Sequence, residues 1–282
     1  MQAYLWLILL SALWGFSFIF MRVAVPSFGP ILLIELRTLI AALTLFPILA
    51  LLKRNIKAGL PLKPLWITGI FNSALPFVMI SVATKYVPAS VAAVLNATTP
   101  LFSLLVAVLL YRQQMNSKNV LGVLLGLTGV AALFGLGALT ITPQVLLACL
   151  CSLIAAASYG FAGNYARHAL KQAAPLVTST YSQFFAALAL LPLVPFVLPD
   201  QTPPVNASVS VLALGVVCTG LAYLIYFKLI REAGAVFTST VTFLAPAFSV
   251  LWGGLLLGEH LTLGLAVGFV LIVLSVRLIN AR

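Results

Sequence analysis

The sequence predicts an all-α integral membrane protein with ten transmembrane helices, arranged as two inverted five-helix repeats with both termini in the cytoplasm. Three observations lead to this fold class. Hydrophobic residues make up 63% of the chain and charged residues only 7%, with a mean hydropathy of +1.19. These values lie far from those of soluble domains and exclude a soluble fold. The apolar residues form runs long enough to cross a bilayer. Two of these runs, residues 96–105 and 242–251, share proline, Phe, Ser and Leu at a fixed offset of 146 residues.

The first half contains five apolar segments of about 20 residues, the length that one crossing needs. The first segment runs past the length of a signal peptide's apolar core and has no positive residues ahead of it, so we expect it to stay in the mature protein. A gap with two prolines follows it, and a basic gap follows the second segment. The fifth carries a Gly-xxx-Gly pattern at 122–126, which favours close helix packing in a scaffold or a dimer contact. The predicted spans are residues 4–25, 31–52, 64–84, 89–110 and 119–138.

The second half repeats this order, and its last segment again carries glycines four residues apart, at 264 and 268. The gaps are short and rich in Pro, Gly and charge, so no soluble domain is inserted. The predicted spans are residues 144–166, 176–198, 208–230, 235–257 and 262–280.

The Lys and Arg residues set the orientation through the positive-inside rule. With the N-terminus in the cytoplasm, twelve of the 15 basic residues fall in inner gaps or the tail. We therefore attribute the formal net charge of +11 to the cytoplasmic gaps of a protein that lies in the cell's inner or plasma membrane. Nucleic acid is not an expected partner, because the basic residues do not gather on one face or one helix.

The duplication divides the chain into residues 1–140 and 141–282, since residues 12–16 also match 157–161 at an offset of 145. Five crossings in each half force the halves to insert in opposite orientations. Inverted repeats commonly place a substrate site near the midplane between the halves and work by rocking one half against the other. A duplication kept only for the symmetry of the scaffold is the alternative.

Three prolines inside predicted spans are the expected hinges: Pro76, Pro100 and Pro246. A proline has no N–H and frees the carbonyl four residues earlier, and in hydrocarbon that carbonyl must be satisfied by protein, water or a ligand. We interpret the proline helices as broken helices that line a central cavity. A simple kink in a packed helix is the alternative.

Ionisable residues are scarce within the spans, and only Glu35 and Arg37 lie clearly inside one. Such residues are functional candidates by default, and Glu35 is the candidate for proton coupling. Pairing with Arg22 or Arg37 would instead make Glu35 structural. Both histidines lie at span ends and the three cysteines in apolar runs, so we expect no metal site, disulfide or cofactor.

The remaining polar and aromatic residues of the spans come partly in pairs across the repeat, for example Phe77 with Tyr223. As a set they predict an uncharged, amphipathic pocket for a small neutral or zwitterionic solute. The candidate substrate-binding residues are Trp14, Ser17, Asn72, Phe77, Asn96, Thr99, Tyr159, Asn164, Tyr223 and Thr242.

Several short motifs resemble the EamA family of the drug/metabolite transporter superfamily, over essentially the whole chain. They are Leu13-Trp14-Gly15, Leu36-Arg37, the Ala-Pro-Ala around Pro246, and Leu257-Gly258-Glu259 followed by Leu261-Thr262. The resemblance implies a transporter of small metabolites, often an exporter of amino acids or related compounds, with helices 1, 3, 4, 6, 8 and 9 around the cavity. One departure is that the first half reads Tyr111-Arg112-Gln113 where the family usually carries Gly-Glu.

Other functions are disfavoured by what the sequence lacks. Multidrug exporters of the same superfamily carry a glutamate in helix 1, where this chain reads Ser11-Ala-Leu-Trp14. A membrane enzyme would need clustered His, Asp, Ser or Cys near one interface. A passive channel is a further alternative. The expected partners are a small-molecule substrate, the lipid bilayer, and protons if Glu35 is the coupling group, with the protein a monomer or weak dimer.

Overall fold

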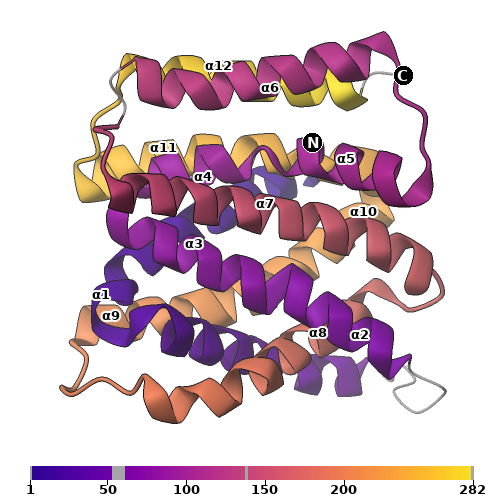
Figure 1. Cartoon of the computed structure of the whole chain (residues 1–282). Helices are drawn as coiled ribbons and strands as arrows, with labels where there is room; N and C mark the ends of the chain where they lie inside the picture. The colour runs from indigo at the N-terminus through magenta and orange to yellow at the C-terminus, as the bar shows by residue number, and fades with distance from the viewer. Residues whose placement is uncertain (1, 53–60, 137–138, 281–282) are drawn as a thin grey trace.

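The computed structural model describes residues 2–52, 61–136 and 139–280, and over this range the chain forms helices joined by turns, with no strand (Figure 1). Within these ranges, eight of the helices are long and apolar enough to cross a membrane, and one further apolar helix is shorter. This confirms the all-helical, multi-pass membrane class that the composition predicts.

The first helix, α1 (Gln2–Leu51), has 50 residues, more than twice the length that one crossing needs. It consists of two arms that meet at Gly29, the one residue within it with non-helical backbone angles (φ 66°, ψ 165°). The prediction of a loop at residues 26–30 is therefore wrong, since the two arms join within one helix at Gly29. A positive φ is easily adopted by glycine, and Pro30, directly after it, fits the first turn of the second arm.

The rest of the first half follows the predicted spans with small shifts at the ends. One span consists of α2 (Leu62–Gly69), the π-helical segment η1 (Ile70–Ala74) and α3 (Leu75–Tyr86). The next is broken into α4 (Ala89–Asn96) and α5 (Thr99–Tyr111). The last helix of the half is α6 (Ser117–Gly135).

The second half begins with α7 (Pro143–Ala169) and α8 (Pro175–Leu190), the latter extended by the 3₁₀ turn η2 (Leu191–Phe196). Next come α9 (Val205–Leu212), the π-helical segment η3 (Ala213–Leu221) and α10 (Ala222–Ser239), which is broken by the positive φ of Gly234. The chain ends with α11 (Val241–Leu257) and α12 (Leu263–Asn280).

Helices α6 and α12 lie side by side along one edge of the bundle (Figure 1). Their glycines face each other: a Cβ on Gly129 would lie 3.0 Å from the carbonyl oxygen of Gly268, and a Cβ on Gly122 would lie 2.9 Å from that of Ser275. These contacts run antiparallel. The predicted small-residue faces are thus used inside the molecule.

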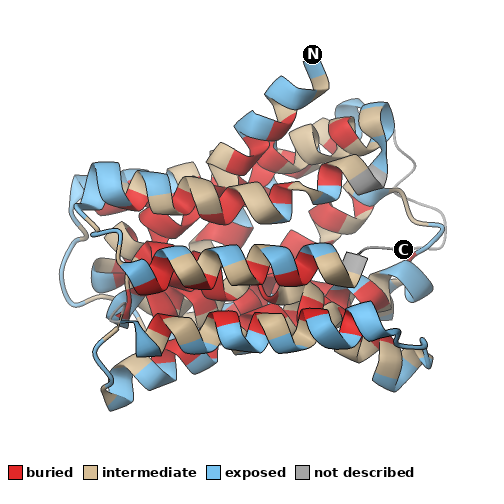
Figure 2. Ribbon diagram, turned by 90° about the horizontal axis from the view of Figure 1, so that it is seen from above, coloured by how far each residue is buried: buried red, intermediate tan, exposed pale blue. Residues whose placement is uncertain are grey.

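Buried residues run through the centre of the bundle, whereas exposed residues cover its outer faces (Figure 2). Many of the exposed residues are large and apolar, among them Leu43, Leu109 and Leu255. An apolar outer surface of this extent suits a lipid environment. The buried centre also contains polar groups, and these define the candidate site.

Candidate functional site

Two π-helical segments lie at matching places in the two halves, η1 in the first and η3 in the second. The backbone bonds of η1 reach five residues back immediately before Pro76, which has no N–H to donate. In η3 the hydroxyl of Thr219 likewise donates to a carbonyl five residues back, at 2.7 Å. Such widened turns occur frequently at functional sites. Here they contribute Ser73 and Thr219, which are both fully buried.

Arg37, on the second arm of α1, is the charged group at the centre of the bundle, with only 4% of its surface exposed. Its Nε donates to Oγ1 of Thr219 at 3.0 Å, and its Nη1 lies 3.5 Å from the sulfur of Met21. Its Cζ sits 3.7 Å from the centroid of the Phe77 ring. Arg37 therefore joins residues of the first half to η3 of the second.

The guanidinium has no carboxylate partner among the residues that the structure describes. Within that part of the chain the one ion pair is the exposed Arg231–Glu232 contact at 3.7 Å. Glu35 is itself 4% exposed, and its Oε2 has no hydrogen-bond partner there. A buried charge without a counter-ion is costly in a protein interior and more so at membrane depth.

Aromatic rings surround Arg37. The ring centroids of Phe77 and Tyr159 are 6.3 Å apart, and those of Trp14 and Tyr223 are 6.4 Å apart. Both tyrosines lie close to the guanidinium.

The amide groups of Asn72 and Gln183 lie near the Tyr223 side chain, and Nε2 of Gln183 donates to the hydroxyl of Ser73 in η1 at 2.9 Å. We call the whole set the central cluster: Trp14, Arg37, Asn72, Phe77, Tyr159, Gln183, Thr219 and Tyr223. The structure thus brings together five of the ten predicted substrate-binding residues.

Three other predicted residues form hydrogen bonds within the protein itself. Ser17 donates to the carbonyl of Trp14 at 2.7 Å, and Asn164 donates to the carbonyl and hydroxyl of Ser103 at 2.9 and 3.0 Å. Thr99 donates to the carbonyl of Asn96 at 2.7 Å. This last bond satisfies the acceptor that Pro100 leaves without an intrahelical partner.

The two remaining predicted residues lie on the proline helices. The side-chain oxygen of Asn96 is buried and has no hydrogen-bond partner within the described residues. Thr242 is exposed, and its hydroxyl donates to the carbonyl of Ser239 at 2.8 Å. In the described part of the chain neither side chain forms a hydrogen bond with a residue of the central cluster.

The predicted hinges differ from one another. The helix before Pro100 is broken at residues 97–98. The corresponding break in the second half falls at Thr240, and Pro246 lies inside α11. The hydroxyl and the N–H of Thr240 both bond to the carbonyl of Phe237, which ends the preceding helix earlier than the proline would.

Two close helix crossings relate the halves reciprocally. A Cβ added to Gly15 of α1 would lie 2.8 Å from the backbone nitrogen of Ser249 in α11. A Cβ added to Gly160 of α7 would lie 2.6 Å from the backbone nitrogen of Ser103 in α5. Gly15 matches Gly160, and Ser103 matches Ser249, in the two aligned halves. Only glycine allows the backbones to approach this closely.

Glu259, directly after α11, caps the start of α4. Its Oε2 accepts from the N–H of Ser90 at 3.0 Å, and its Oε1 from the neighbouring N–H. Gln113, the matching residue of the first half, is exposed. The turns themselves are alike: Arg112 and Gly258 both have positive φ (53° and 65°). Only the second half thus carries the carboxylate that bridges to the other half.

Arg22 binds the end of α3, just before the α4 start that Glu259 caps, and in the described residues it is not a partner of Glu35. Its Nη1 donates to the carbonyls of Thr84 and Val87, at the end of α3. In the described residues neither Arg22 nor Arg37 pairs with Glu35, so both predicted structural pairings are wrong in this conformation.

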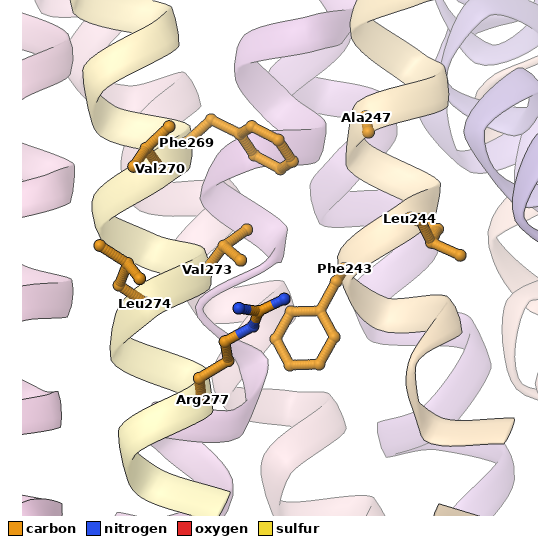
Figure 3. Close-up of a pocket in the computed structure, with 8 residues that line it drawn as sticks. All are labelled: Phe243, Leu244, Ala247, Phe269, Val270, Val273, Leu274 and Arg277. Atoms are coloured by element: carbon orange, nitrogen blue, oxygen red, sulfur yellow. The ribbon is translucent and has the colours of Figure 1, made fainter. Parts of the chain in front are cut away.

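A separate groove of about 320 Å³ lies between α11 and α12 (Figure 3). Apolar side chains line its walls, and Arg277 lies at one end beside Phe243 (Figure 3). None of its lining residues belongs to the central cluster. Among the described residues no group of three or more His, Cys, Asp or Glu could hold a metal, and the three cysteines are free.

Three residues of the central cluster lie outside the predicted set of substrate-binding residues: Arg37, Gln183 and Thr219. The sequence did contain a signal for Arg37, because an ionisable residue inside a span is a functional candidate by default.

Comparison with known proteins gives a consistent result. The model of the EamA-like transporter family matches residues 1–135 and again residues 146–281. A protein of Archaeoglobus fulgidus named as a transporter is 25% identical over 99% of both chains. The transporter YoaV of Bacillus subtilis is 25% identical over 94% of this chain and 92% of its own. One crystal structure, 23% identical, has the same fold with a TM-score of 0.65 over 99% of this chain and 96% of the other.

Proposed function

The chain belongs to the EamA-like transporter family, and from this membership we propose that it carries a small metabolite across the membrane by alternating access between two inverted halves. The Archaeoglobus fulgidus and Bacillus subtilis relatives are named as transporters and not as enzymes. The proposed halves are residues 1–140 and 141–282. Counting the two arms of α1 separately and including α12 gives ten crossings, with both termini in the cytoplasm.

Several features support the inverted repeat. The family model matches each half separately. The close crossing of α1 and α11 at Gly15 has its counterpart in the close crossing of α7 and α5 at Gly160. The π-helical segments η1 and η3 also occupy matching places.

The observation that carries the proposal is the central cluster, because its polar and aromatic side chains come from both halves and meet in the bundle interior. A site between the halves is reached from alternate sides when one half rocks against the other. We propose that Trp14, Asn72, Phe77, Tyr159 and Tyr223 contact the substrate. Asn96 and Thr242 are proposed to join them on the proline helices, with Pro76, Pro100 and Pro246 as hinges.

Ser17, Thr99 and Asn164 bond to the protein itself, so we propose that they shape the helices around the site. The proposed substrate is a neutral or zwitterionic metabolite, an amino acid or a derivative, and the proposed direction is export. A lipophilic cation is disfavoured because Arg37 would repel it. Glu35 is the proposed coupling group if transport uses protons, and the proposed oligomeric state is a monomer or weak dimer.

The test is counterflow in proteoliposomes. Vesicles with purified protein are loaded with a mixture of unlabelled amino acids, and the uptake of each labelled amino acid is measured from outside. We expect at least one to exchange well above protein-free vesicles. No exchange with any member of the mixture would contradict the proposed substrate class.

A further inference from the structure

We propose that Arg37 binds a carboxylate of the transported substrate. This inference rests on the proposed function and makes it more specific, since it assigns the charged end of the ligand. The observations that lead to it are the burial of Arg37, its position between the halves, and the absence of a counter-ion among the described residues.

The guanidinium has free hydrogen-bonding capacity. Arginine has five N–H donors arranged as a planar fork. The described contacts use Nε, which binds Thr219, and Nη1, which faces the weak acceptor sulfur of Met21. Nη2 has no hydrogen-bond partner in the described part of the chain. A carboxylate would both supply the missing negative charge and accept two parallel bonds from the fork.

The charge of the cluster favours a carboxylate over a phosphate. Arg37 is the one basic residue in the central cluster, so the site offers a single positive charge. A carboxylate has one negative charge and would be balanced, whereas a phosphate ester carries about −1.5 to −2 at neutral pH. A phosphate bound there would therefore have negative charge in the buried site that Arg37 does not neutralise.

The aromatic rings indicate what is attached to the carboxylate. Phe77 covers one face of the guanidinium, and Trp14, Tyr159 and Tyr223 lie around it. These rings offer apolar surface to a hydrocarbon or aromatic body. Their faces also attract an ammonium group, so an α-amino acid with an apolar side chain matches all parts of the cluster.

The experiment measures the exchange of matched acids and amides in proteoliposomes. The probes are L-phenylalanine and L-leucine with their carboxamides, 3-phenylpropionate, and phenyl phosphate. The wild type should exchange at least one of the acids about tenfold faster than its amide, as expected for the loss of a charge-assisted pair. Phenyl phosphate should not compete.

Three variants assign this preference to Arg37. Arg37→Met should reduce exchange of the acid about tenfold or more and bring the ratio of acid to amide close to one, whereas Arg37→Lys should keep part of the preference. Arg277→Met removes a guanidinium from the groove between α11 and α12 and should behave as wild type. Size-exclusion profiles and circular dichroism establish that each variant is folded.

The outcomes separate the two proposals. Equal exchange of acid and amide by the wild type, an unchanged preference in folded Arg37→Met, or stronger competition by phenyl phosphate would each overturn the role of Arg37 and leave the transporter proposal standing. Equal exchange of acid and amide by the wild type overturns the role of Arg37 even if Arg37→Met does not fold, and the Arg37→Lys variant then provides the test of assignment. Absence of exchange with every probe would overturn the proposed substrate class and this assignment together.

Discussion

The carboxylate oxygen Oε1 of Glu259 accepts a hydrogen bond from the backbone N–H of Ala89 at 2.6 Å. This bond joins residues 170 positions apart and ties the end of α11 in the second half to the start of α4 in the first. Unpaired N–H groups and the helix dipole make a helix start a favourable place for a negative charge. Glu259 therefore connects the two halves by hydrogen bonds at one end of the bundle.

We expect Glu259→Gln to lower the stability of the protein by about 1 kcal/mol, because the amide has one acceptor and no charge to offer the helix start. The measurement is the apparent melting temperature in detergent. Gln113→Ala, at the matching and exposed position of the first half, is the control and should not change it. Equal melting temperatures of wild type and Glu259→Gln would show that this connection does not stabilise the protein.

Arg112→Gly should stabilise the protein by about 1 kcal/mol. Arg112 adopts a φ of 53°, a left-handed conformation that costs other residues more than glycine. Gly258→Ala, at the matching turn, should act in the opposite direction. Thermal unfolding of both variants checks the pair, and a lower melting temperature for Arg112→Gly would show that the side chain contributes more than the backbone strain costs.

Gly160→Ala should destabilise the bundle by about 1–3 kcal/mol and reduce transport, since the added Cβ would lie 2.6 Å from the backbone of Ser103. Gly163→Ala, one turn further along α7, is the matched control because its Cβ would meet nothing within 4 Å. Both are compared by melting temperature and by counterflow. A neutral Gly160→Ala would contradict the close crossing.

Pro100→Ala and Pro246→Ala should slow transport more than they destabilise the fold, because each restores a backbone N–H and favours a straight helix. Exchange rates are compared at matched protein incorporation, together with melting temperatures. Pro195→Ala, at an exposed position in η2, is the control. Rates equal to wild type in both variants would exclude a hinge role.

Glu35→Gln should abolish accumulation driven by a pH gradient while exchange of substrate for substrate continues. Carrying a proton requires a titratable side chain at membrane depth that no salt bridge holds in the charged form, and Glu35 has no ion pair in the described residues. Uptake is measured with and without the gradient. An unchanged response would exclude Glu35 as the coupling group, and a wild type without any response would indicate facilitated diffusion.

The sequence predicts most helices well because hydropathy over about 20 residues is a local property. It does not predict the joint at Gly29, since two prolines near a glycine also fit a loop. It places a break near Pro246, but the hydrogen bonds of Thr240 end the helix earlier.

Five of the eight residues of the central cluster could be predicted in the same way. Trp14, Phe77 and Tyr223 are recognisable as aromatic residues in apolar spans. The role of Arg37 could not be predicted, because its partner Thr219 lies 182 residues further along the chain. Contacts of this kind depend on how the helices pack, which no local pattern encodes.

The antiparallel pairing of α6 with α12 has a consequence for the order in which the protein is made. The glycine face of α6 packs against a helix that begins about 130 residues later in the chain. At typical rates of translation this delay is roughly ten seconds. Over that time α6 must reside in the bilayer without its partner, and its apolar composition permits this. We therefore expect a chain truncated before α12 to insert α6 but to leave its glycine face against lipid.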